Sequence, residues 1–511
     1  MLAVEAALAT VYLKTVPRFY NDDAWLASLG DCLAREHTLR HPIIHGWGGM
    51  HIHFVQNQVV LPFVLAPIFR VFGLTIVTAR LGSVLFAMMA LVATYGLTRR
   101  LFGSRAAFWT SAALIVNFWF FEVSRRVRPE IYYIALAVAA LWCLVEATQR
   151  KSRGLGVLCG LLAALACLSH PSGILLSGAA AGSALVWLPH RKPALRTLAW
   201  AGLAFVLTVL PYVVYVIWAI QDPNVSFLEQ MSGKGQAGLG SLVARLPLEI
   251  RRWRNFFQWP RGLPLAAVAA FTWISAWVRS RRSDKLVATT VLLFSLLLPL
   301  LSVNYAGRYL SALTPFLAIL LVRFVQRTSP AWVQLRHLRP RLRLTVASAV
   351  VVIYAGINVG AIGLMFHRLR DADVTRVFDR IASVTGPDAR VYGEIMLWMG
   401  GGRYRYGPFP IDSQWAATIE MIRPFDFDYV VRGAWNWGAS HGVSLPPKVM
   451  PPTRPDVPYD PVAAMYGTRV DQFYDPHYGM IEIYKIDWSR PAPPVSAPGS
   501  ASRKARTQPP G

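Results

Sequence analysis

The sequence predicts a polytopic α-helical membrane protein that carries a small extramembrane α/β domain towards its C-terminal end. Of its 511 residues 54% are hydrophobic and only 15% are charged, and the mean hydropathy is +0.38. A soluble chain of this length would need far more polar surface, so most of it is expected to face lipid. The net charge of +25 comes from short basic clusters between long apolar runs. This pattern is typical of membrane loops rather than of nucleic-acid binding.

About eleven segments are long and apolar enough to be candidate membrane spans, for which about 20 apolar residues are needed. These candidates are residues 2–16, 76–97, 106–123, 131–148, 155–170, 172–188, 197–219, 263–279, 286–303, 309–325 and 343–366. Residues 57–72 are apolar but short, and two prolines interrupt them, which favours an interfacial or re-entrant helix. Residues 1–366 are therefore expected to form the membrane domain.

The distribution of basic residues predicts the orientation of this domain. Alternate connections carry the clusters TRRLFGSR, QRKSR, HRKPALR and RSRRSDK, and the positive-inside rule places them in the cytoplasm. The loops 17–56 and 220–262 then lie on the outer side, together with everything beyond residue 366.

The C-terminal part, residues 367–490, has the composition of a small α/β domain. DADVTRVFDRIASV reads as an amphipathic helix, and ARVYGEI, FDYVVRG and IEIYKID read as strands. The tail, residues 491–511, is rich in Pro, Ser, Gly and Ala and is expected to be disordered. The four cysteines show no CxxC spacing, so no disulfide framework is inferred.

The first candidate for chemistry is the acidic pair in YNDDAWLAS, Asp22 and Asp23. Asn21 or Asp22 could cap a helix that runs through AWLASLGDCLARE, which would present a carboxylate at the membrane edge. A carboxylate there can accept a proton from a hydroxyl group or help to hold a divalent metal ion. The alternative is a capping aspartate beside a solvated one.

Arginines on the predicted outer side form the second candidate, because the positive-inside rule gives no reason for them. Guanidinium groups bind phosphate oxygens in pairs, so these residues could bind an anionic ligand. Contact with lipid headgroups or simple solvation is the alternative, and Glu130 could merely begin a helix after Pro129. The residues in question are Arg125, Arg126 and Arg128 before Glu130 in SRRVRPEIYY, and Arg308 with Tyr309 in NYAGRYL.

The third candidate is a pair of histidines, His51 and His53, in HGWGGMHIHFVQNQ. In an extended segment these two side chains share a face and could bind one divalent metal ion, with the acidic residues completing the site. Two histidines make only half a site, and solvated loop histidines are the alternative.

In their order and sidedness these features resemble the polyprenyl-phosphate-sugar-dependent glycosyltransferases of the GT-C superfamily. The branch it resembles is the bacterial one related to protein O-mannosyltransferases and the lipid A aminoarabinose transferase. The resemblance covers roughly residues 10–325 and rests on the acidic pair, SRRVRPE, GLLAALACLSHPSGILL and NYAGRYLSALTPFL. It implies a GT-C-like membrane core in the bacterial inner membrane, with an active site that faces away from the cytoplasm.

The resemblance also implies roles for individual residues. Asp22 and Asp23 match the catalytic acidic position, with Asp22 preferred, and Glu130 matches a second acidic position. Arg308 and Tyr309 match the motif beside the lipid phosphate. The sequence departs from the family in having Asp as the second residue of the pair, and the proline-rich part of the first loop is reduced.

The expected function is therefore the transfer of a sugar from a polyprenyl-phosphate donor to an acceptor hydroxyl on the periplasmic side, by a single displacement with an acidic base. A transporter or flippase of lipid-linked sugars is an alternative, although it predicts ionisable residues near mid-membrane and few are present. A non-catalytic protein of envelope assembly is another.

Overall fold

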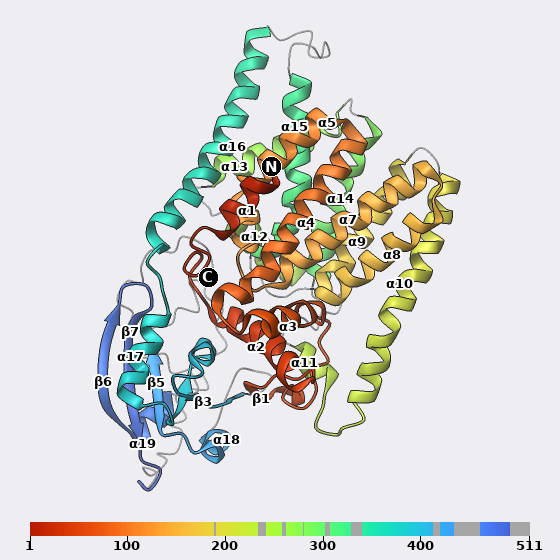
Figure 1. Ribbon diagram of the computed structural model, residues 1–511. Coiled ribbons are helices and arrows are strands. Elements are labelled where there is room, and N and C mark those ends of the chain that lie inside the picture. Colours follow the sequence, from red (N-terminus) through yellow and green to blue (C-terminus); the bar gives the residue numbers. More distant parts are fainter. Residues whose placement is uncertain are drawn as a thin grey trace.

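A helical bundle with a mixed β-sheet at one end forms the computed structural model of the protein (Figure 1). The structure describes residues 1–188, 191–232, 242–257, 262–278, 281–301, 307–328, 340–411, 419–433 and 460–490. The expected disordered tail, residues 491–511, lies outside these ranges, as does part of the expected outer loop 220–262.

The first part of the chain is almost entirely helical. Its helices are α1 (Leu2–Thr10), α2 (Asn21–Glu36), α3 (Val60–Phe72), α4 (Ile76–Phe102), α5 (Ser104–Ile115), α6 (Phe118–Val123), α7 (Pro129–Arg150), α8 (Arg153–Ser169), α9 (Pro171–Trp187), α10 (Arg191–Ala219), α11 (Phe227–Ser232), α12 (Leu242–Phe256), α13 (Leu263–Ser275), α14 (Arg282–Leu301), α15 (Thr314–Thr328) and α16 (Pro340–Leu369). The 3₁₀ turns are η1 (Trp47–Gly49) and η3 (Gly307–Leu313), and the latter leads into α15.

Five helices in the described part of the chain are long and apolar enough to cross a membrane: α4, α7, α10, η3 with α15, and α16. The expected count of about eleven spans is therefore not confirmed, although a helical membrane architecture is. The expected span 106–123 breaks into α5 and α6 because Asn117 caps the second helix, its side chain accepting a hydrogen bond from the backbone N–H of Phe120 at 3.0 Å. Helices α8 and α9 have 17 residues each.

Helix α7 is the centre of the bundle. Of its most apolar window 89% is buried, against 11% for α10 and 22% for α16, which lie at the edges in Figure 1. Close packing of α4 on α7 depends on glycine, since a Cβ atom added at Gly96 would lie 2.4 Å from the Trp142 ring. The first turn of this central helix carries Glu130.

The C-terminal part forms a five-stranded sheet in the order β3-β2-β5-β7-β6. The pairs β3–β2 and β2–β5 are parallel, whereas β5–β7 and β7–β6 are antiparallel. The elements are α17 (Thr375–Thr385), β2 (Arg390–Gly393), η4 (Ile395–Gly400), β3 (Arg405–Tyr406), α18 (Ile419–Ile422), η5 (Arg423–Phe425), β5 (Tyr429–Gly433), α19 (Asp460–Tyr466), β6 (Gly467–Asp475) and β7 (Gly479–Ile486). The expected helix is α17, and the three expected strands are β2, β5 and β7.

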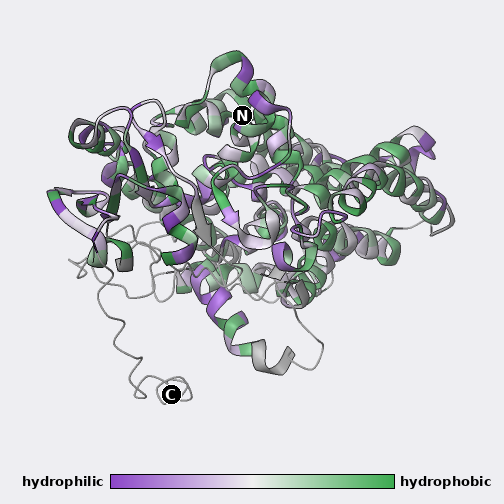
Figure 2. Ribbon diagram, turned by 90° about the horizontal axis from the view of Figure 1, so that it is seen from below, coloured by the Kyte–Doolittle hydropathy of each residue, from purple (hydrophilic) through white to green (hydrophobic). Residues whose placement is uncertain are grey.

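Two strands join this domain to the first loop of the helical bundle. Strand β1 (Ile44–Gly46) pairs in parallel with β4 (Phe409–Ile411), although the paired residues, such as Ile44 and Phe409, are 365 positions apart in the chain. Seen from below, hydrophobic residues dominate the helices of the bundle, and hydrophilic residues are more frequent around the sheet and the neighbouring loops (Figure 2). The sheet, α2 and α3 therefore share one end of the molecule (Figure 1).

Candidate active site

The site begins at the first turn of α2. Tyr20, in an extended conformation, is the N-cap, and its backbone N–H donates a hydrogen bond to Asp23 Oδ2 at 3.2 Å. The expected helix is confirmed, but its cap is Tyr20 rather than Asn21 or Asp22. Asn21, Asp22 and Asp23 are the first three helical residues, so their side chains point in three different directions from one turn.

Asp23 is enclosed by protein. Its side chain is 1% exposed, its Oδ1 accepts a hydrogen bond from the backbone N–H of Val127 at 3.0 Å, and its Oδ2 lies 3.5 Å from Arg80 Nη2 and 3.9 Å from Arg126 Nη1. These contacts fasten the segment before α7 to the start of α2. Asp23 therefore holds the site together rather than facing it.

Asp22 is the accessible member of the pair, with 29% of its side chain exposed. Its Oδ2 accepts a hydrogen bond from Arg128 Nη2 and lies 3.7 Å from Arg308 Nη2. Burial would raise the pKa of Asp22, but the positive charges of Arg128 and Arg308 outweigh burial and hold this pKa below its ordinary value. Asp22 is therefore an ionised carboxylate between two guanidinium groups.

Glu130, in the first turn of α7, supports the same two arginines from behind. Its side chain is 2% exposed, and its Oε1 lies 3.3 Å from Arg308 Nε and 3.8 Å from Arg128 Nη1. Two carboxylates and two guanidiniums thus meet at one place, from α2, α7, the segment before α7 and η3. The structure brings together Asp22, Arg128, Glu130 and Arg308, although Asp22 and Arg308 lie far apart in the sequence.

The other two arginines of the SRRVRPE motif point elsewhere. Arg125 is fully buried and donates hydrogen bonds to the backbone carbonyls of Leu8, Val11 and Val16, which anchors the end of α1. Arg126 donates to Glu122 Oε1 at 2.9 Å and lies beside Asp23. Of this cluster only Arg128 reaches Asp22.

An aromatic stack borders the site on the side of α9. The ring of His170, the N-cap of α9, lies 5.6 Å from the ring of Tyr133 and 5.6 Å from that of Tyr309, and the Arg308 guanidinium lies over Tyr309. His170 Nδ1 accepts a hydrogen bond from the backbone N–H of Ser172 at 3.1 Å, so a neutral ring carries its proton on Nε2. The sequence predicted Tyr309 at this site but not Tyr133 or His170. The only signal for these two is local spacing: Tyr133 follows Glu130 by three residues, and His170 directly precedes Pro171.

The two histidines proposed as metal ligands do not converge. The His51 ring is stacked on His45 with 4.4 Å between centroids, and the His53 ring meets the edge of Trp218 at 4.7 Å. Among the residues that the structure describes, no group of three or more His, Cys, Asp or Glu side chains is placed to hold a metal ion. Since Asp22 and Glu130 already face arginines, the residues present do not fit the expected divalent metal site.

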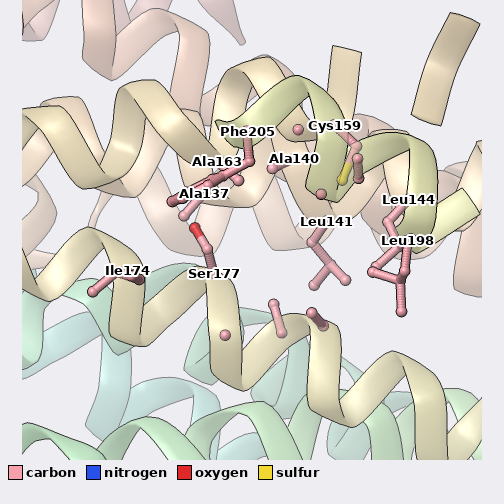
Figure 3. Close-up of a pocket in the computed structure, with 16 residues that line it drawn as sticks. Ala137, Ala140, Leu141, Leu144, Cys159, Ala163, Ile174, Ser177, Leu198 and Phe205 are labelled. Atoms are coloured by element: carbon pink, nitrogen blue, oxygen red, sulfur yellow. The ribbon is translucent and has the colours of Figure 1, made fainter. Parts of the chain in front are cut away.

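An apolar groove of about 240 Å³ lies between α7, α8, α9 and α10 (Figure 3). It is lined mostly by Ala, Leu and Gly, including Ala137 and Leu141 of α7 and Ile174 of α9. Ala137 is four residues beyond Tyr133, and Ile174 is four residues beyond His170. Because an α-helix turns once in 3.6 residues, the groove begins about one turn from the aromatic stack on both helices.

The known proteins that match this sequence are glycosyltransferases. A family described as dolichyl-phosphate-mannose-protein mannosyltransferase matches residues 57–218. The probable arabinosyltransferase C of Mycolicibacterium smegmatis is 31% identical over 179 residues, which are 34% of this chain and 16% of that protein. The chain thus matches only a small part of this relative's length.

Solved structures extend the likeness to the whole chain. The structure of ArnT from Cupriavidus metallidurans bound to undecaprenyl phosphate is 16% identical, with a TM-score of 0.61 over 96% of this chain and 98% of that one. An oligosaccharyltransferase from Archaeoglobus fulgidus, tethered to an acceptor peptide, is 12% identical with a TM-score of 0.54 over 96% and 74%. The chain therefore shares the fold of these solved structures, in agreement with the GT-C-like fold that its motifs predict. The structure of ArnT matches it over nearly its whole length.

Proposed function

We propose that the protein is a membrane glycosyltransferase that moves a sugar from a polyprenyl-phosphate donor to an acceptor hydroxyl. The observation that carries the proposal is the cluster of Asp22, Arg128, Arg308 and Glu130, in which an accessible carboxylate lies against two guanidiniums. A guanidinium pair suits a phosphate, and a carboxylate beside it suits a base for the hydroxyl that attacks.

Donor binding would change the partner of the two arginines. In the protein alone Asp22 is their counter-ion, and a donor phosphate competes for the same guanidinium groups. Once the phosphate takes Arg128 and Arg308, Asp22 loses the charges that hold its pKa down. The same exchange that binds the donor thus makes Asp22 a stronger base.

The chemical step is a single displacement at the anomeric carbon. The proton of the acceptor hydroxyl passes to Asp22, the acceptor oxygen bonds to the anomeric carbon, and the bond from that carbon to the phosphate oxygen breaks. The electron pair leaves on the polyprenyl phosphate, whose added charge Arg308 and Arg128 neutralise. Glu130, buried behind both arginines, keeps them in place.

We place this site on the periplasmic side of the bacterial inner membrane, because the basic clusters of the opposite connections favour the cytoplasm. The C-terminal domain would lie on the same side, since β4 pairs with β1 of the first loop.

Transfer of a labelled sugar tests the proposal directly. Purified full-length protein in lipid vesicles is given synthetic polyprenyl-phosphate sugars and a crude envelope acceptor fraction, with and without a chelator. Label recovered in the acceptor, with free polyprenyl phosphate released in equal amount, is the expected result. Movement of intact donor across the membrane without release of phosphate would instead indicate a flippase, and absence of both would overturn the proposal.

The acid limit of activity should differ between the free protein and the donor complex. The pKa of Asp22 is lowered in the protein alone, so kcat/KM should stay flat down to about pH 4, the ordinary range of an aspartate. In the donor complex the arginine charges are shared with phosphate, so the acid limb of kcat should lie at higher pH. The ion pair of Asp22 stabilises the fold above the ordinary pKa, and this contribution is lost as the pH falls through the lowered one. Coincident acid limbs for kcat and kcat/KM would contradict the exchange of partners.

We further propose that the groove between α7 and α10 holds the first isoprene units of the donor. Gly178 lines this groove, and a Cβ atom added there meets no other atom within 4 Å. Gly178→Leu should fill the groove without a backbone clash and remove apolar burial from the donor chain, at about 0.8 kcal/mol per CH₂. The KM for a long-chain donor should rise about tenfold, and the KM for a two-isoprene donor should change little.

The matched control is Gly356→Leu in α16, which has equally open space and does not line the groove. It should leave both KM values unchanged. An equal rise in KM for long and short donors in Gly178→Leu would show that the groove does not bind the chain.

A further inference from the structure

The C-terminal domain holds the chain segment that leads to Asp22. Lys14 Nζ lies 2.6 Å from Asp373 Oδ2 and donates to Thr375 Oγ1 at 3.1 Å. Arg18 donates to the backbone carbonyl of His477, and its guanidinium lies over the ring of Tyr478. Two cations of the segment between α1 and α2 are therefore bound by the domain that follows α16.

The last of these contacts lies directly beside the proposed base. Asn21 Nδ2 donates a hydrogen bond to Glu394 Oε2 at 2.6 Å, and Asn21 Oδ1 accepts one from the backbone N–H of Met396 at 3.1 Å. Asn21 is 5% exposed and Glu394 is 1% exposed. Both polar ends of the Asn21 side chain are thus satisfied by two residues, Glu394 directly after β2 and Met396 in the first turn of η4.

These bonds complete the fixation of the first turn of α2. Asn21, the first helical residue, is held by the C-terminal domain, and Asp23, the third, is held by Val127 of the bundle. Asp22 lies between them. Its backbone is therefore fixed from both sides, so the reach of its carboxylate towards Arg128 and Arg308 is set by contacts that Asp22 does not make itself.

The carboxylate of Glu394 holds Asn21 by a strong hydrogen bond and not by packing alone. A buried carboxylate costs several kcal/mol of desolvation unless strong hydrogen bonds repay it. A charged acceptor forms a shorter and stronger hydrogen bond than a neutral amide does, and the 2.6 Å bond to Asn21 is of this kind. Such a bond fixes the side chain of Asn21 more tightly than shape alone would.

We propose that Glu394 is a positioning residue for Asp22 and acts through Asn21, so that the C-terminal domain sets the place of the base. The inference rests on the proposed function. It gives the C-terminal domain a part in the reaction of the bundle, because a base displaced by about 1 Å can lose about 100-fold in rate.

The test measures sugar transfer by full-length variants in vesicles, with kcat and the donor KM determined separately. Glu394→Ala should lower kcat about 10- to 100-fold with little change in KM, whereas Glu394→Gln, which keeps an oxygen acceptor for Asn21 but only a neutral and weaker one, should give a kcat between those of the wild type and Glu394→Ala. The acid limb of kcat/KM should move to higher pH in Glu394→Ala, since a displaced Asp22 loses part of its contact with Arg128. A residue that only stabilised the fold would lower the amount of active protein without moving this limb.

Asn21→Ala tests the same link from its other side, and it also removes the hydrogen bond from Met396, so it should lower kcat at least as much as Glu394→Ala. The double variant should be no slower than Asn21→Ala, because Asn21→Ala already removes the bond to Glu394. Asp373→Ala is the matched control, since it breaks another contact between the same segment and the same domain. Asp373→Ala should leave kcat within about twofold of the wild type. It should lower the unfolding temperature about as much as Glu394→Ala does.

Two results would overturn the inference while the proposed function stands: an active wild type with Glu394→Ala at full kcat, or single effects that multiply in the double variant. Absence of transfer by the wild type would instead overturn the proposed function and the inference with it. If Glu394→Ala fails to fold, Asn21→Ala and Glu394→Gln still decide between these outcomes.

Discussion

Asp22→Asn should lower kcat for sugar transfer by about 10²- to 10⁴-fold, the range that a general base contributes. The amide has nearly the same shape and can still accept a hydrogen bond from Arg128, so the fold should remain. It cannot take a proton from the acceptor hydroxyl. Single-turnover transfer from a saturating labelled donor measures the loss, and the donor KM should rise little or even fall, because Asp22 no longer competes with the phosphate.

The control for this substitution is Asp31→Asn, the same change on the same helix at a pair with Arg35, whose side chain is 68% exposed. It should keep the wild-type rate, because Asp31 lies outside the cluster and an ion pair with one solvent-exposed partner contributes at most about 1 kcal/mol to folding. Asp23→Asn is the informative comparison. Its loss of activity should accompany a loss of stability of about 3–5 kcal/mol, since it breaks a buried charged contact with Arg80 and Arg126. Wild-type transfer by Asp22→Asn would exclude Asp22 as the base.

Much of this site could be predicted from the sequence because its parts stand at the ends of apolar segments. An acidic pair after the first apolar run, a glutamate that begins α7 and an arginine before α15 must share one end of the bundle if the helices alternate in direction. The structure confirms that Asp22, Glu130 and Arg308 meet. The strands β2, β5 and β7 could be predicted because each is a short run rich in β-branched and aromatic residues.

The direction of single side chains could not be predicted. Arg125, Arg126 and Arg128 stand in a non-helical segment of five residues, 124–128, where the local turn of the backbone decides which one faces Asp22. Likewise the difference between Asp22 and Asp23 depends on one residue of helix phase, about 100°. The link from Asn21 to Glu394 spans 373 residues, and no local pattern distinguishes that glutamate from any other at the end of a strand.

The expected number of spans is not confirmed, for a different reason. Hydropathy averages over a window, whereas a helix ends at one residue. Asn117 Oδ1 accepts a hydrogen bond from the backbone N–H of Phe120, and Asn358 Oδ1 accepts one from the backbone N–H of Phe118. Helix α5 therefore ends and α6 begins inside one apolar run. Buried side-chain caps of this kind are visible only when distant segments are placed together.

Arg308→Gln should lower kcat/KM by about 10²- to 10³-fold, because Arg308 is the cation through which the charge of the leaving phosphate would be neutralised. Its side chain is 16% exposed and lies 3.7 Å from Asp22 and 3.3 Å from Glu130, so it faces the opening of the cluster from a fixed position. Arg308→Lys keeps the charge but not the paired geometry of a guanidinium, and should recover only part of the loss. Steady-state transfer with the long-chain donor measures both.

A purely structural role for Arg308 makes a different prediction, since its removal leaves Glu130 with one fewer positive partner inside the protein. Adding Glu130→Gln to Arg308→Gln removes that unpaired charge and should restore the unfolding temperature, but it should not restore transfer. Arg150→Gln, at the exposed pair with Glu146, is the control and should change neither quantity. Recovery of transfer together with stability in the double variant would show that Arg308 only supports the fold. Persistent loss of transfer in a stable double variant is the expected outcome, because the charge that leaves with the phosphate would then meet only Arg128.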